Sequence, residues 1–199
     1  MATPDRRRLL SATTAGALCF LASPARAQAP AASSSTRLGA WALGSNLSLA
    51  ALLYGQGASQ DLVERTRGRA EAIAKLLGFE RLPPFPAREA SGPATQAAII
   101  HYLIKGDGAQ LGAALGKRYD QAHVVLFELA AKSNLLILLY APGDDSGLAS
   151  LVEDRARRLA LPSETWMPLV EAVRAKKPQG EVKNAVFAMH AAVAKHLGA

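Results

Sequence analysis

The stretch from residue 109 to residue 140 constrains the fold of this chain more than any other. Apolar residues recur there at three- and four-residue spacing, which predicts a helix. Its first half carries a polar stripe through Lys117 and Glu128, whereas its last two turns present Leu135 and Leu139 on that same side. A helix that is apolar nearly all round must be surrounded by other helices. The sequence therefore predicts one long central helix, with a break near Lys117 as the alternative.

The rest of the chain also follows helical spacing, and the alternating runs typical of strands are scarce. Further helices are predicted at about 37–54, 59–77, 93–105, 148–161, after Pro162, and 181–197. Residues 82–86, which contain three prolines, predict an extended strap. Gly108, Gly112 and Gly116 are expected to let another helix approach closely. We therefore expect an all-α, single-domain bundle of six or seven helices over residues 37–199.

Residues 1–27 are typical of a cleaved export signal. Three arginines at positions 6–8 precede an apolar stretch at 9–21, and Ala25-Arg26-Ala27 has the small-x-small form of a cleavage site. The paired arginines ahead of Leu9-Leu10 favour twin-arginine export over the general secretory route. We expect cleavage near Ala27, a flexible segment at 28–36, and a mature protein in the periplasm or secreted.

Removal of that segment changes the charge and the cysteine content of the chain. Loss of four arginines and one aspartate lowers the formal net charge from +7 to +4, and the single cysteine is lost as well. A mild charge without clustering argues against nucleic-acid binding. A chain without cysteine has no thiolate metal site and no cysteine nucleophile. The longest apolar run, residues 135–142, is too short to cross a bilayer, so we expect no membrane-spanning segment after maturation.

Three short matches at a spacing near 88 residues suggest an internal repeat. Ser45-Asn46-Leu47 recurs as Ser133-Asn134-Leu135, Leu52-Leu53-Tyr54 as Leu138-Leu139-Tyr140, and Leu62-Val63-Glu64 as Leu151-Val152-Glu153. One interpretation is a duplicated three-helix unit, with repeats at 37–106 and 109–199 about an approximate two-fold axis. The other is coincidence between common residues.

Two asparagines occupy the same place in these repeats and are candidate ligand contacts. Asn46 and Asn134 are both predicted to point inward, where an amide left unpaired costs about 1–3 kcal/mol. A ligand is one partner that would satisfy them. The alternative is that the amides bond to each other or to a backbone carbonyl and fix the helix register.

Four further side chains complete the candidate site. Arg69 and Arg158 each follow a repeat leucine by two helical turns, so they are expected beside an apolar stripe, where a guanidinium needs an anion. The alternative is that they extend past the stripe or pair with a glutamate. Tyr119 and His123 lie one turn apart on the buried side of the central helix, where they could contact a ligand. The alternative is that His123 is a hydrogen-bonded core residue.

No catalytic, metal-binding or cofactor-binding motif is present, so the sequence does not favour an enzyme and predicts no metal and no cofactor. We interpret the chain as an exported binding module whose core, lined by those six residues, holds a small amphiphilic or anionic ligand. One alternative is a protein–protein interaction or structural bundle with a filled core, whose partner docks near an exposed Trp41 or the strap. A weaker one is a periplasmic cofactor-dependent enzyme.

Overall fold

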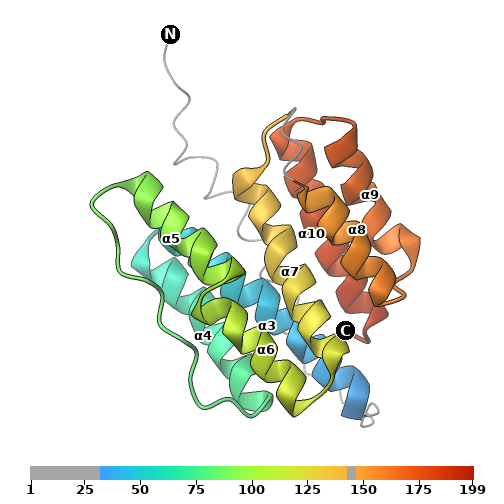
Figure 1. The fold of residues 1–199 in the computed structure, drawn as a ribbon, viewed down its shortest axis with the longest axis horizontal. Coiled ribbons are helices and arrows are strands. Elements are labelled where there is room, and N and C mark those ends of the chain that lie inside the picture. Colours follow the sequence, from blue (N-terminus) through green and yellow to red (C-terminus); the bar gives the residue numbers. More distant parts are fainter. Residues whose placement is uncertain (1–31, 143–146) are drawn as a thin grey trace.

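The computed structural model describes residues 32–142 and 147–199, and these form helices and connecting segments with no strand among them (Figure 1). The all-α class predicted from the sequence is confirmed. The expected export signal at 1–27 lies outside the described residues. In chain order the helices are α3 (Ala32–Gly55), α4 (Gln60–Leu76), α5 (Gly92–Ile104), α6 (Asp107–Arg118), α7 (Gln121–Leu139), α8 (Leu148–Arg158), α9 (Ser163–Arg174) and α10 (Gln179–His196).

Helix α7 is the central helix, as its apolar sequence predicts. Figure 1 shows α3 and α7 in the middle, with α4, α5 and α6 on one side and α8, α9 and α10 on the other. The packing between α3 and α7 is the most extensive in the fold, and α7 also contacts α5, α6, α8 and α10. Leu126, Leu129 and Leu136 of α7 are at most 1% exposed. The main core therefore surrounds this helix.

The long helix predicted over 109–140 is in fact two helices, α6 and α7, separated at Tyr119 and Asp120. The break lies slightly beyond the alternative position near Lys117. Asp120 has extended backbone angles, and its side chain accepts a hydrogen bond from the backbone N–H of His123 at 3.1 Å. This is the N-cap arrangement that starts a new helix.

Small residues set how closely the helices approach. A Cβ atom added at Gly108, Gly112 or Gly116 would lie 2.6–2.8 Å from a side chain of a neighbouring helix, which confirms these glycines as packing positions. Gly44 of α3 is tighter still. A Cβ there would lie 2.4 Å from the backbone oxygen of Phe127, so the backbones of α3 and α7 approach each other directly at this point.

One expectation about the first helix is wrong, and the helix begins earlier than predicted. Helix α3 begins at Ala32, ahead of the predicted start at about residue 37, and the hydroxyl of Thr36 lies 3.0 Å from Nε2 of His123 on α7. Trp41, expected to be exposed, is 2% exposed. The physical reason is that α3 is covered by α4, α7 and α10 together, so it has no broad outer face at Trp41.

The proline-rich strap is not helical, as predicted, and hydrogen bonds hold it against α4 and α5. The carbonyl of Pro83 accepts hydrogen bonds from the hydroxyl of Tyr102 at 3.1 Å and from Arg67 at 3.2 Å. The guanidinium of Arg67 also lies 4.6 Å from the ring centre of Phe85. Arg67, two positions before the arginine singled out in the sequence, thus holds the connection between α4 and α5.

The tripeptides that suggest a repeat lie at matching places in the helix order. Asn46 is on α3 and Asn134 on α7, while Leu62 and Leu151 lie near the starts of the following helices, α4 and α8. The second half contains five described helices, α6 to α10, against three in the first. The duplication therefore stays a prediction.

Among the described residues, α7 alone is long and apolar enough to cross a membrane by length and composition. In the fold, 61% of that window is buried by other helices. A core helix can also be this long and this apolar, and burial by other helices is typical of it.

Candidate functional site

The two asparagines matched by the repeat have different surroundings. Asn134 is 2% exposed, and its amide donates to the carbonyl of Ser45 at 3.1 Å and to the hydroxyl of Ser48 at 2.9 Å. Asn46, predicted to point inward, is only half-buried, and it donates to the carbonyl of Ala42 in its own helix at 2.8 Å. Asn134 therefore joins α7 to α3. Both amides donate to backbone carbonyls, which agrees with the alternative to a ligand contact, and they do not bond to each other.

The two arginines also lie apart. Arg69 is half-buried on α4. Arg158 is exposed at the end of α8, where its Nε donates to Asp154 at 3.1 Å. This fits the alternative in which the arginine extends past the apolar stripe, because Arg158 is the last residue of α8 and its side chain is 64% exposed.

Tyr119 and His123 are brought together, and Asp120 and Thr36 both contact His123. Their rings stack with centres 4.8 Å apart. Nδ1 of His123 lies 2.7 Å from Oδ1 of Asp120, and Nε2 lies 3.0 Å from the hydroxyl of Thr36. Because an ionised Asp120 only accepts, Nδ1 donates to it, and in the neutral imidazole Nε2 then accepts from the hydroxyl of Thr36. The hydrogen bond from His123 is the main reason that the pKa of Asp120 lies below its usual range.

His190 has a buried interaction that the sequence analysis did not identify. Its Nε2 lies 2.8 Å from the hydroxyl of Ser133, and its ring lies 4.8 Å from that of Trp41. Ser133 donates to the carbonyl of Ala130, so the neutral histidine donates from Nε2 and leaves Nδ1 as a bare acceptor. That atom is buried and has no hydrogen-bond partner among the described residues, and burial lowers the pKa of His190 to about 4.

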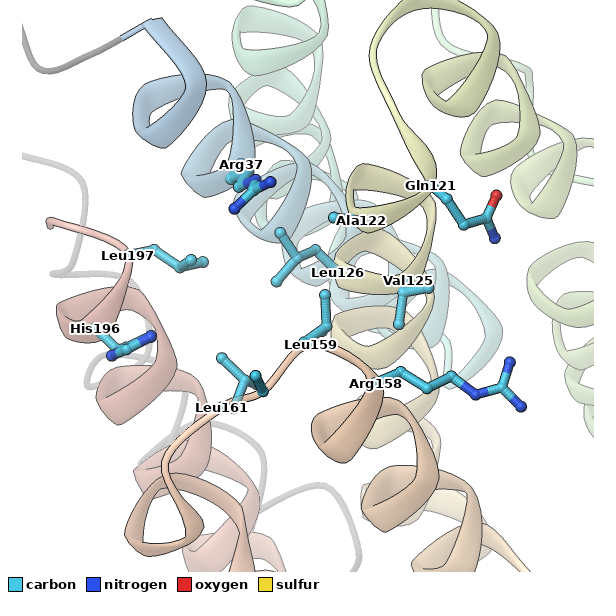
Figure 2. A pocket seen from close by; sticks show the side chains of 11 residues that line it. Arg37, Gln121, Ala122, Val125, Leu126, Arg158, Leu159, Leu161, His196 and Leu197 are labelled. Carbon is cyan, nitrogen blue, oxygen red and sulfur yellow. The ribbon is translucent and has the colours of Figure 1, made fainter.

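Of the six predicted residues, Arg158 lines a cleft that the sequence did not suggest. This cleft, here called the leucine cleft, has a volume of about 410 Å³ and lies between α3, α7, α8 and α10 (Figure 2). Its apolar residues are Ala122, Val125, Leu126, Leu159, Ala160, Leu161 and Leu197, and its polar residues are Arg37, Gln121, Arg158 and His196.

The leucine cleft combines a hydrocarbon surface with basic side chains. Figure 2 shows Leu126, Leu159, Leu161 and Leu197 converging from three elements, with Arg37 and His196 at the edges. Among the described lining residues none is acidic. A second cleft, of about 430 Å³ between α4 and the strap, instead mixes acidic and basic side chains and contains only two apolar residues.

The counter-ions of the two arginines lie just outside the leucine cleft. Nη2 of Arg37 is 3.6 Å from Oδ2 of Asp120, and both side chains are nearly half exposed. Asp154 is shared between Arg158 and Arg155, at 3.1 and 2.8 Å. Each carboxylate thus has a second partner, so the arginines are only partly neutralised.

Helix ends favour the Arg37 side of the cleft for an anion. Helix α7 begins at Gln121, and a helix N-terminus carries a partial positive charge. Arg158 and His196 instead stand at the C-terminal ends of α8 and α10, where they offset a partial negative charge. An anionic group is therefore best placed beside Arg37.

Neither metal chemistry nor a known family is indicated. The described residues hold no group of three His, Cys, Asp or Glu side chains that could bind a metal ion. Comparisons with protein-family models, with curated proteins and with solved structures gave no match. The geometry of the chain itself is therefore the basis for assigning a function.

Proposed function

We propose that this protein is an exported binding module that takes a small amphiphilic anion in the leucine cleft. The observation that carries the proposal is the cleft of about 410 Å³, in which converging leucines meet Arg37, Arg158 and His196 and none of the described lining residues is acidic. Ligand sites are typically about 300–1,000 Å³, mostly apolar, with a few polar groups that orient the ligand. The ligand is thus placed in this cleft and not in the helix core, where the sequence predicts it.

The expected binding mode follows from the arrangement of the lining. The alkyl chain of the ligand lies against Leu126, Leu159 and Leu161, where it loses contact with water. The anionic group lies beside Arg37 at the start of α7. The amide nitrogen of Asn134 plays no direct part, because it already donates hydrogen bonds to Ser45 and Ser48.

Calorimetric titration with octanoate, and with octan-1-ol as an uncharged probe, tests this function. Octanoate should bind more tightly than octan-1-ol, and Arg37→Gln should weaken octanoate binding about tenfold, since a hydrogen bond to a charged group contributes roughly 1.5–3 kcal/mol. Arg65→Gln is the matched control, because Arg65 forms an exposed ion pair with Asp61 within α4. Absence of octanoate binding, or equal loss in both variants, would contradict the proposal.

Export is the second part of the proposal and depends on the pattern in residues 1–27. Replacing Arg6, Arg7 and Arg8 together by lysine keeps the positive charge but removes the arginine pair. We expect the unchanged chain in the periplasmic fraction with Gln28 as its first residue, and the lysine variant in the cytoplasm. A lysine variant that is exported normally would indicate the general secretory route instead.

A further inference from the structure

Asp120 stands beside the position proposed for the anionic group, and its two oxygens have different partners. Oδ1 accepts from Nδ1 of His123 at 2.7 Å and from the backbone N–H of the same residue at 3.1 Å. Oδ2 lies 3.6 Å from Nη2 of Arg37, beyond the 2.7–2.9 Å typical of a charge-assisted hydrogen bond. The carboxylate is therefore fixed to α7, while Arg37 is held loosely.

This arrangement keeps a negative charge at the edge of the leucine cleft. His123 is 3% exposed and is held from its other side by Thr36, so it does not move freely with the carboxylate. Asp120 caps α7 and cannot turn away from Arg37 without losing two hydrogen bonds. A ligand that approaches Arg37 consequently meets one loosely paired cation and one anion that is held by two hydrogen bonds.

The opposing charges affect ligands of different charge differently. A single negative charge on the ligand gains from Arg37 and from the start of α7, and both oppose the repulsion from the half-exposed carboxylate of Asp120. A second negative charge gains less, because the other basic side chains among the described lining residues, Arg158 and His196, stand apart from Arg37 at the ends of α8 and α10 (Figure 2). It also meets added repulsion from Asp120.

We infer that Asp120 makes the leucine cleft selective for monoanionic amphiphiles, that is, carboxylates with an alkyl chain, over dianionic ones such as alkyl phosphates. This inference rests on the proposed function. Asp120 acts as a specificity-determining residue through repulsion, a common means by which binding sites discriminate between related ligands.

The test compares octanoate with octyl phosphate, which carries close to two charges at pH 7.5. Both are titrated calorimetrically into the unchanged protein, Asp120→Asn and Asp61→Asn. Asparagine caps helices as well as aspartate does, so the fold is expected to persist. The unchanged protein should prefer octanoate, and Asp120→Asn should shift the affinity ratio toward octyl phosphate roughly threefold to tenfold, as expected for removal of one like charge nearby. Asp61→Asn, an exposed position on α4, should leave the ratio unchanged.

A second variant separates charge from folding. Asp120→Ser is neutral and also a good N-cap, so it should shift the ratio in the same direction as Asp120→Asn. An unchanged ratio in both variants, with octanoate still bound by the unchanged protein, would overturn the selectivity and leave the proposed function standing. If the unchanged protein binds neither compound, the proposed function and the selectivity both fail.

Discussion

At the scale of single residues, equal positions in a sequence pattern do not imply equal roles. Asn46 and Asn134 match in the suggested repeat, yet one bonds within its own helix and the other connects two helices. The difference arises because Asn134 faces a backbone carbonyl and a hydroxyl on α3 that spacing within α7 cannot reveal. Its contribution to stability should therefore be larger.

Alanine at each of these positions tests that difference. Asn134→Ala removes two hydrogen bonds from a buried site and should lower the free energy of unfolding by about 1–3 kcal/mol. Asn46→Ala removes one bond at a half-exposed site and should cost less than about 1 kcal/mol. Urea unfolding monitored by circular dichroism measures both. Equal losses would mean that the bonds to Ser45 and Ser48 contribute little.

Gly44 gives a second prediction at this scale. A Cβ at this position would lie 2.4 Å from the backbone oxygen of Phe127, and backbone cannot rotate aside as a flexible side chain can. Gly44→Ala should therefore destabilise the fold by about 1–3 kcal/mol. Gly68 is the matched control, since it lies within α4 and a Cβ there meets nothing within 4 Å. Gly68→Ala should be neutral or stabilise by up to about 1 kcal/mol in the same urea measurement.

At the scale of helices, α10 is attached to the central pair by apolar packing and by polar contacts. Val182, Val186, Met189 and Val193 are at most 2% exposed, as their spacing predicts. His190 adds a hydrogen bond to Ser133 of α7 and a ring contact with Trp41 of α3. A neutral imidazole is thus buried where three helices meet, and protonation there is unfavourable.

This burial makes stability depend on pH in a defined direction. In the unfolded chain the imidazole takes up a proton near pH 6.5, whereas burial lowers the pKa of His190 to about 4 in the fold. Between these values the unfolded state binds more protons, so the free energy of unfolding falls as the pH falls from 6.5 to 4, by up to about 3 kcal/mol.

Urea midpoints at pH 7, 6 and 5 for the unchanged protein and His190→Leu measure this effect. The variant should show a weaker pH dependence over that interval. Asp120 acts in a lower range, because its pKa lies below the usual value and its stabilisation is lost only as the pH falls further. Parallel pH profiles for the two proteins would show that His190 is not the group responsible.

At the scale of the whole molecule, the sequence predicts the helices better than it predicts their polar contacts. The periodicity of α4 and α10 and the apolar character of α7 are local properties, so they could be read from the chain. The break at Asp120 was harder to place, because residues on both sides continue the helical spacing and only the cap interrupts it.

The candidate site required information that spacing does not contain. The partners of Asn134 and His190 lie 86–89 and 57 residues away along the chain, and the leucine cleft is formed by four helices. Only Arg158 of the six predicted residues lines that cleft. The sequence does contain basic residues at the ends of α8 and α10, Arg158 and His196. Such residues indicate a favourable interaction with the helix end as readily as a ligand contact.

The packing of α3 on α7 predicts how the two halves depend on each other. Leu43 and Leu47 of α3 and Leu129 of α7 are fully buried, and they lie in one core cluster that spans both halves. In residues 32–106 alone, Leu43 and Leu47 would be exposed to water, at roughly 1.5–3 kcal/mol for each leucine. We therefore expect the separate fragments 32–106 and 107–199 to be poorly helical and to gain helicity when mixed in equal amounts. Circular dichroism of each fragment and of the mixture measures this, and a cooperative thermal transition in fragment 32–106 alone would show instead that the first half is an autonomous three-helix unit.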